Sequence, residues 1–143
     1  MVQYLLDSNF LVALIDEADV HHNRATRLLE KITAEDAEFF VSDLLINEVL
    51  SVFAKRCEQK KKERDFPSLV RKFQTALRGY PVLCLYELVA KQLGSLIDLM
   101  VHHRARFNFH DALLLTFLKE LPEMRLVTFD QDFGGIGSLK VIG

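Results

Sequence analysis

The stretch Val2-Gln3-Tyr4-Leu5-Leu6-Asp7-Ser8-Asn9 decides the fold of this chain. Its first five residues form a short, mostly apolar run, which is typical of a buried strand. The three polar residues that follow favour turns and helix caps. We therefore predict a strand over residues 2–6 that leads directly into a helix from about Phe10, with the carboxylate of Asp7 at the junction.

The rest of the sequence alternates between helical and strand patterns. We expect helices over about 21–32, 42–57, 67–79, 87–104 and 110–120, and strands over 38–41, 82–85, 125–129 and 139–142. Short apolar strands joined by helices predict an α/β fold with a parallel sheet and helices on both of its faces. The charged run from Gln59 to Asp65 is either a protruding segment or the solvated surface of a helix.

Length and composition predict a single globular domain over residues 1–143. Half of the residues are hydrophobic and 27% are charged, as in an ordinary folded domain of this size. No apolar run reaches the roughly 18 residues of a membrane span, and the amino terminus lacks the pattern of a signal peptide. The formal net charge of −2 attracts no polyanion, so any contact with nucleic acid would need a local basic patch.

The two cysteines predict neither a disulfide framework nor a zinc site. Cys57 and Cys84 form no CxxC pair, and we expect them at a helix end and in a buried strand. A reducing, cytoplasmic setting follows as the default expectation.

Two aspartates follow predicted strands. Asp7 ends the first apolar run, and Asp130 comes directly after Leu126-Val127-Thr128-Phe129. In an open α/β sheet, ligands bind beyond the carboxyl ends of the strands. If these two strands are neighbours, their carboxylates share one crevice. Taken singly, each aspartate is better explained as a turn or cap residue.

Two further acids lie on predicted helices. Glu48 falls inside the apolar stripe of its helix, with Leu44 and Val52 four residues to either side, so its carboxylate should point toward the core. An ionised group there requires a basic partner or a cation. Asp111 opens a helix whose face continues with Leu115. The plainer alternatives are a glutamate at the rim of the core and an ordinary aspartate in a first helical turn.

Four carboxylates in one cleft would repel one another unless they hold hard cations. Oxygen ligands alone suit Mg²⁺ or Mn²⁺. Ser8, Asn9 and Thr128 could add polar contacts that orient the acids, or they could be plain capping and turn residues.

Four short motifs, each of which contains one of these acids, occur along the chain in the order Asp7, Glu48, Asp111 and Asp130. With these motifs the chain resembles the PIN-domain family, and in particular its small toxins of the VapC type. The motifs are LLDSN with Asp7, INEV with Glu48, FHDALL with Asp111 and TFDQDF with Asp130. The resemblance implies a three-layer α/β/α domain with a five-stranded parallel sheet, and an acidic Mg²⁺ or Mn²⁺ site that cleaves single-stranded RNA. The last acidic position varies in the family, so Asp132 could take the place of Asp130. The resemblance also implies a homodimer and an antitoxin protein that silences the site.

Such a site cleaves a phosphodiester with metal-activated water, and the sequence leaves open whether one or two ions bind. The basic and aromatic stretch from His102 to His110 is either a rim that contacts RNA or a helix end followed by phenylalanines that anchor a loop in the core. The adjacent pairs His21-His22 and His102-His103 lack the spacing of a helical zinc clamp.

Other functions fit parts of the sequence. An aspartate after the first strand is also the nucleophile of phosphatases and phospho-accepting domains, although these usually place a second acid beside it and give Glu48 no role. A non-catalytic binding module would have no need of all four acids. A free-standing RNA-processing nuclease of the same family would carry almost the same sequence.

Overall fold

The computed structural model describes residues 1–143, and its centre is a sheet of five parallel strands. The strands are β1 (Val2–Leu6), β2 (Ala37–Ser42), β3 (Val82–Leu83), β4 (Arg125–Val127) and β5 (Lys140–Ile142), in the order β3-β2-β1-β4-β5. The predicted α/β fold with a five-stranded parallel sheet is confirmed. Because β1 lies in the middle, its carboxyl end has a neighbouring strand on each side.

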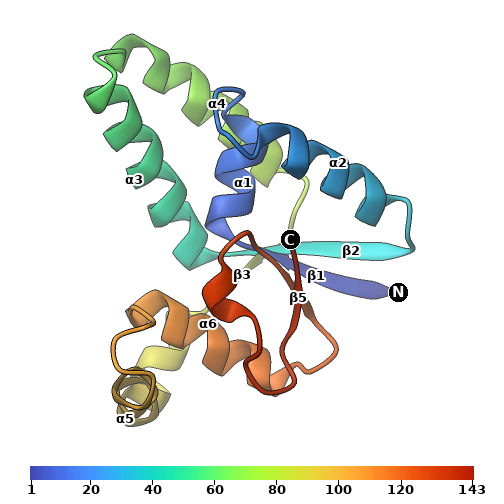
Figure 1. Ribbon diagram of the computed structural model, residues 1–143, viewed down its shortest axis with the longest axis vertical. Helices are drawn as coiled ribbons and strands as arrows, with labels where there is room; N and C mark the ends of the chain where they lie inside the picture. Colours follow the sequence, from blue (N-terminus) through green and yellow to red (C-terminus); the bar gives the residue numbers. More distant parts are fainter.

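Helices cover both faces of the sheet (Figure 1). They are α1 (Ser8–Ile15), α2 (His22–Thr33), α3 (Asp43–Gln59), α4 (Phe66–Leu77), α5 (Glu87–His102) and α6 (Phe109–Glu120), with short 3-10 turns η1 (Glu63–Asp65) and η2 (Gln131–Phe133). Helices α1 to α4 lie on one side and α5 and α6 on the other. No helix combines the length and apolar character needed to cross a membrane.

Two hydrophobic cores meet at the sheet, because successive residues of a strand face opposite sides. In β1, Tyr4 and Leu6 pack into the core beneath α1 to α4, whereas Leu5 packs into the core beneath α5 and α6. In β4, Leu126 and Val127 divide in the same way. All five side chains are at most 1% exposed, and polar residues follow directly where the two strands end, at Asp7 and Thr128.

Some sequence expectations need correction. The third strand ends at Leu83, and Cys84 is exposed, not buried. This strand lies at the edge of the sheet and pairs with β2 alone, which leaves the following residues without a second neighbour. Both cysteines are free, as expected.

The charged run between α3 and α4 forms the tip of a helical hairpin. Residues 60–62 turn the chain, with Lys61 in the left-handed conformation (φ 53°), and η1 leads into α4. Figure 1 shows this tip projecting away from the sheet. The segment is therefore a protruding connection.

Candidate metal centre

An open cleft of about 390 Å³ lies at the carboxyl ends of the two central strands. All four predicted acids line it, together with His110 and the polar side chains of Ser8, Asn9, Asn47, Ser51 and Asn108. No lysine or arginine is among the lining residues. The fold thus gathers acids from β1, α3, α6 and the end of β4 without supplying a permanent positive charge.

Asp7 stands where β1 passes into α1. Its extended backbone (φ −87°, ψ 161°) makes it the N-cap of α1, and its Oδ1 accepts a hydrogen bond of 2.8 Å from the Ser8 amide. Its Oδ2 accepts a 2.7 Å hydrogen bond from the Thr128 hydroxyl. Its own amide donates to the carbonyl of Val127. Asp7 is therefore fixed by both its own helix and the neighbouring strand.

The buried hydroxyl of Thr128 connects three segments of the cleft. It accepts hydrogen bonds from Asn9 Nδ2 and the Asp130 amide, each 3.0 Å long. Its single proton has two acceptors within reach, Asp7 at 2.7 Å and Asn9 Oδ1 at 3.2 Å. The shorter, charge-assisted bond to the carboxylate is the stronger. Asn9 is in turn held by the Phe129 amide, which donates to its Oδ1.

Glu48 reaches the cleft from the second turn of α3. Its side chain is 27% exposed, and its Oε1 lies 2.9 Å from His110 Nδ1. The neighbouring helical residues Leu44, Leu45 and Val49 are buried. Glu48 thus lies at the rim of the apolar stripe and does not point into the core. This is the second of the two positions that the sequence allowed.

Asp111 is fixed by a capping box at the start of α6. Asn108 is the N-cap: its Oδ1 accepts from the Asp111 amide at 2.9 Å, and its own amide donates to Asp111 Oδ2 at 3.0 Å. This reciprocal pair satisfies two of the free amides of the first helical turn. The carboxylate of Asp111 is therefore both a cap residue and a lining residue of the cleft.

The two candidates for the fourth acid point to different places. Asp130 lines the cleft, and its Oδ1 accepts from the Asp132 amide at 2.9 Å, which caps η2. Asp132 is exposed and pairs with Arg106 at 3.4 Å. Of the two, only Asp130 is among the residues that line the cleft.

Two acids of the cleft, Asp7 and Asp111, have raised pKa values. Burial, together with the smaller effect of the charges of Glu48 and Asp111, raises the pKa of the Asp7 carboxyl from 3.8 to about 6, although the hydrogen bonds from Thr128 and Ser8 lower it. Burial also raises the pKa of Asp111, with contributions from Glu48 and Asp130. The pKa values of Asp7 and Asp111 are thus raised in part by the negative charge of neighbouring acids.

The donor set fits a hard divalent cation. Three acids keep one carboxylate oxygen without a hydrogen-bond partner in the protein: Glu48 Oε2, Asp111 Oδ1 and Asp130 Oδ2. Carboxylate oxygens are the ligands that Mg²⁺ and Mn²⁺ prefer. No three acidic, histidine or cysteine side chains already stand in metal-binding geometry, so these side chains must turn toward an ion to bind it.

The sequence matches the PIN domain family over residues 4–138. The chain belongs to the PIN-domain family. The match includes all four acids of the cleft. No curated protein sequence matches the chain significantly.

Solved structures similar to this PIN domain include VapC toxins of VapBC toxin–antitoxin systems. VapC20 of Mycobacterium tuberculosis, a toxin that cleaves the sarcin-ricin loop, is 20% identical with a TM-score of 0.69, over 94% of this chain and 95% of that one. VapBC2 of Rickettsia felis, bound to a DNA fragment from its promoter, is 18% identical with a TM-score of 0.66, over 99% and 98%. A toxin–antitoxin complex from Klebsiella pneumoniae is 20% identical with a TM-score of 0.62, over 98% and 96%. At these identities the likeness concerns the fold.

The basic and aromatic stretch beside the cleft of this PIN domain divides into two parts. Phe107 is buried against Phe133, with a distance of 5.6 Å between ring centroids, so it anchors the loop in the core. His102 and Arg104 are exposed, and Arg104 has a left-handed backbone (φ 51°). The interpretation as a core anchor is therefore confirmed for Phe107, whereas contact of the exposed residues with RNA stays a prediction.

Several polar residues of the cleft were not predicted as site residues. Ser51 follows Glu48 by three positions, so helical spacing alone would have placed it on the same face. Asn47 gives no such signal. His110 was expected only as part of a substrate rim, and its contact with Glu48 joins residues 62 positions apart, which no local pattern reveals.

Proposed function

We propose that this PIN domain is a divalent-metal-dependent ribonuclease, and specifically the toxin of a toxin–antitoxin pair. The observation that carries the proposal is a cleft lined by Asp7, Glu48, Asp111 and Asp130 with no lysine or arginine among its walls. A cation bound there would relieve the repulsion among the ionised carboxylates. Family membership supports nuclease chemistry, and the VapC structures support the role of a toxin.

The four acids of the cleft would be the metal ligands. A bound Mg²⁺ or Mn²⁺ would lower the pKa of a water molecule and neutralise charge on the scissile phosphate. Asp7 is held rigidly by Thr128 and Ser8 and is the best fixed of the ligands. Glu48 and Asp111 each offer one carboxylate oxygen that has no protein partner. Asp130 is the fourth acid in this proposal.

The substrate in this proposal is single-stranded RNA, and the exposed loop at residues 102–106 supplies its phosphate contacts. His102 and Arg104 are exposed there. Arg106 is engaged by the Asp132 carboxylate and backbone carbonyl, which leaves it partly neutralised. Arg104 therefore supplies the permanent positive charge of this loop that is not paired with a carboxylate.

Two protein partners complete the proposal. Helix α5 packs on α6 and exposes Leu93, Ile97 and Val101 at intervals of four residues, which places them on one face. Two copies pairing antiparallel across this face would put Ile97 at the two-fold axis and Leu93 against Val101 of the other copy. We expect a homodimer by light scattering, and a monomer for Ile97→Asp but not for Lys91→Ala.

The second partner is an antitoxin, proposed because similar structures were solved as toxin–antitoxin complexes. Expression of the chain alone in a bacterial host should arrest growth. Arrest should disappear with Asp7→Asn and with co-expression of a small protein encoded beside this gene. Metal-dependent RNA cleavage without growth arrest would instead favour an RNA-processing nuclease of the same family.

The enzymatic test is incubation of the purified protein with single-stranded RNA. We expect cleavage with Mn²⁺ or Mg²⁺, none with chelator and none with Asp7→Asn. The matched control is Asp36→Asn, which removes the same charge next to the amino end of β2, at the opposite end of the strands from the cleft. Metal-independent cleavage, or full activity of Asp7→Asn, would contradict the proposal. Capture of a phosphorylated Asp7 would point to the phosphatase class instead.

A further inference from the structure

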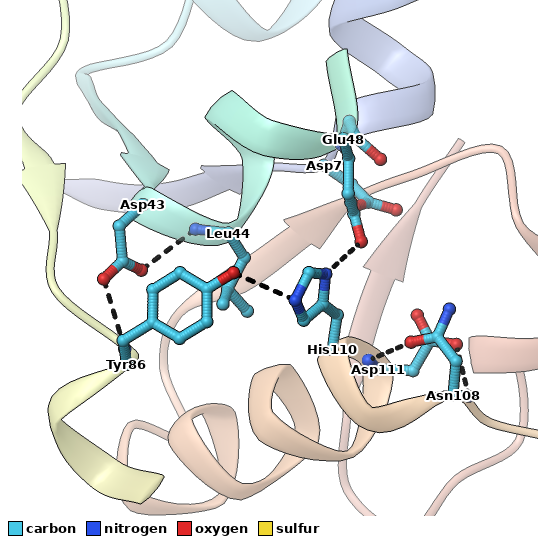
Figure 2. A network of polar contacts seen from close by, with 9 residues as sticks. Asp7, Asp43, Leu44, Glu48, Tyr86, Asn108, His110 and Asp111 are labelled. Atoms are coloured by element: carbon cyan, nitrogen blue, oxygen red, sulfur yellow. Dashed lines mark hydrogen bonds and ion pairs between the residues drawn. The ribbon is translucent and has the colours of Figure 1, made fainter. Parts of the chain in front are cut away.

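His110 lies between the Glu48 carboxylate and the Tyr86 hydroxyl. Its Nδ1 is 2.9 Å from Glu48 Oε1 and its Nε2 is 3.0 Å from the Tyr86 oxygen. Figure 2 shows the imidazole bridging the two groups. The rings of Tyr86 and His110 also meet edge to face, with centroids 5.7 Å apart. Both nitrogens of the imidazole are therefore engaged by protein groups.

These contacts assign the proton of the imidazole. An ionised carboxylate only accepts hydrogen bonds, so the bond to Glu48 requires a proton on Nδ1. In the neutral ring Nε2 is then an acceptor, and the Tyr86 hydroxyl donates to it. The tautomer and the ring orientation are thus set by the partners at its two ends.

Tyr86 is itself tied back to the helix that carries Glu48. The amides of Leu85 and Tyr86 donate to the Asp43 carboxylate at 2.9 and 3.1 Å, and Asp43 also accepts from the Leu44 amide at 3.0 Å. Figure 2 shows the resulting closed path from the start of α3 through Tyr86 and His110 back to α3. Three segments, α3, the start of α5 and the start of α6, are locked together by it.

We propose that His110 and Tyr86 are positioning residues that hold Glu48 ready for a divalent cation. The inference rests on the proposed metal site. His110 takes up Oε1 of the glutamate and leaves Oε2 without a protein partner, so one oxygen is restrained while the other can serve as ligand. A glutamate has three rotatable side-chain bonds, and without this restraint it would have to be ordered when the metal binds.

The expected loss of metal affinity can be taken from other metal sites. Removal of a side chain that hydrogen-bonds to a metal ligand typically weakens metal binding by about 10–100-fold. The contact between His110 and Glu48 is direct, whereas Tyr86 acts through the imidazole. We therefore expect a larger loss for His110 than for the Tyr86 hydroxyl.

The first test is calorimetric titration with Mn²⁺ of the wild-type protein and four variants. The side-chain amide of Asn overlays Nδ1 of histidine, and that of Gln overlays Nε2. His110→Asn should therefore keep the donor to Glu48 and bind Mn²⁺ within about threefold of wild type, whereas His110→Gln and His110→Ala should lose about tenfold or more. Tyr86→Phe should lose a smaller factor. Circular dichroism and thermal unfolding identify any variant that fails to fold.

The second test needs no metal. Long-range ¹⁵N–¹H spectra of the imidazoles at pH 8, with chelator, should show His110 as the Nδ1–H tautomer. The Nε2–H form is expected in Glu48→Ala. A wild-type His110 in the Nε2–H form, or equal Mn²⁺ affinity of all four variants and wild type, would overturn the inference, as would His110→Asn binding as weakly as His110→Ala. Failure of the wild type to bind Mn²⁺ would instead refute the proposed metal site, while the spectra still test the arrangement of Glu48, His110 and Tyr86.

Discussion

The Thr128 hydroxyl donates a 2.7 Å hydrogen bond to Asp7, and the two residues are 121 positions apart in the sequence. The same oxygen accepts from Asn9 and from the Asp130 amide. One buried side chain thus holds the first acid of the cleft and the segment that carries the last one.

Loss of this hydroxyl should lower both stability and activity. Thr128→Val leaves Asp7 without a donor and the Asp130 amide without an acceptor, and we expect a loss of about 1–3 kcal/mol in the free energy of unfolding, measured with urea. Thr128→Ser keeps the hydroxyl and should retain most of the RNA cleavage. Equal stability of the valine and wild-type proteins would show that the hydroxyl contributes nothing.

The raised pKa of Asp7 should make the metal-free protein less stable as the pH rises. The unfolded chain ionises this group near pH 3.8 and the folded protein near pH 6, so the folded state holds more protons between these values and loses stability across that window. With chelator at pH 8, Asp7→Asn should therefore be more stable than wild type by about 1–3 kcal/mol. This advantage should shrink as the pH falls from 6 to 4. An advantage independent of pH would contradict the assignment.

Asp130 and Asp132 should differ sharply when each is changed to asparagine. Asp130 lines the cleft, whereas Asp132 is exposed and pairs with Arg106. Asp130→Asn should reduce RNA cleavage by about tenfold or more, and Asp132→Asn by less than about twofold. Initial rates at saturating Mn²⁺ measure the difference. The reverse order would move the fourth acid to position 132.

Arg56, which does not line the cleft, should contribute to the free energy of unfolding. It pairs with Asp16 at 2.8 Å and with Asp19 at 2.7 Å, and both carboxylates are largely buried. Arg56→Met leaves two buried charges unpaired and should cost about 3–5 kcal/mol. The matched control is Lys72→Met, whose pair with Glu17 is exposed and should contribute less than about 1 kcal/mol.

The same cluster should contribute to acid denaturation. Burial opposes ionisation of Asp19, but the His21 amide and the Arg56 guanidinium outweigh it and lower the pKa of Asp19. A lowered carboxyl pKa gives stability that is present above pH 4 and is lost as the pH falls. Wild-type protein should therefore lose more stability than Arg56→Met between pH 5 and pH 2, followed by thermal unfolding.

Local patterns in the sequence predicted most of the secondary structure and the positions of the acids along it. Asp7 could be placed at a strand end because the apolar run before it is unambiguous. That Asp7 and Asp130 share a cleft depends on β1 and β4 being neighbours, which a single sequence does not determine. The contacts of His110 with Glu48 and Tyr86 were missed for the same reason, since they join helices far apart in the chain. The exposure of Cys84 was missed because the apolar pattern does not reveal that the strand ends at Leu83, at the edge of the sheet.

The placement of β1 between β2 and β4 has a consequence for synthesis. A chain still emerging from the ribosome already contains Asp7 and Glu48 but lacks the strand that brings Thr128 to them. Because β1 pairs with β4, the cleft can assemble only after β4 and the residues that follow it have left the ribosome. The cleft therefore stays incomplete until the segment that carries Thr128 and Asp130 has been synthesised.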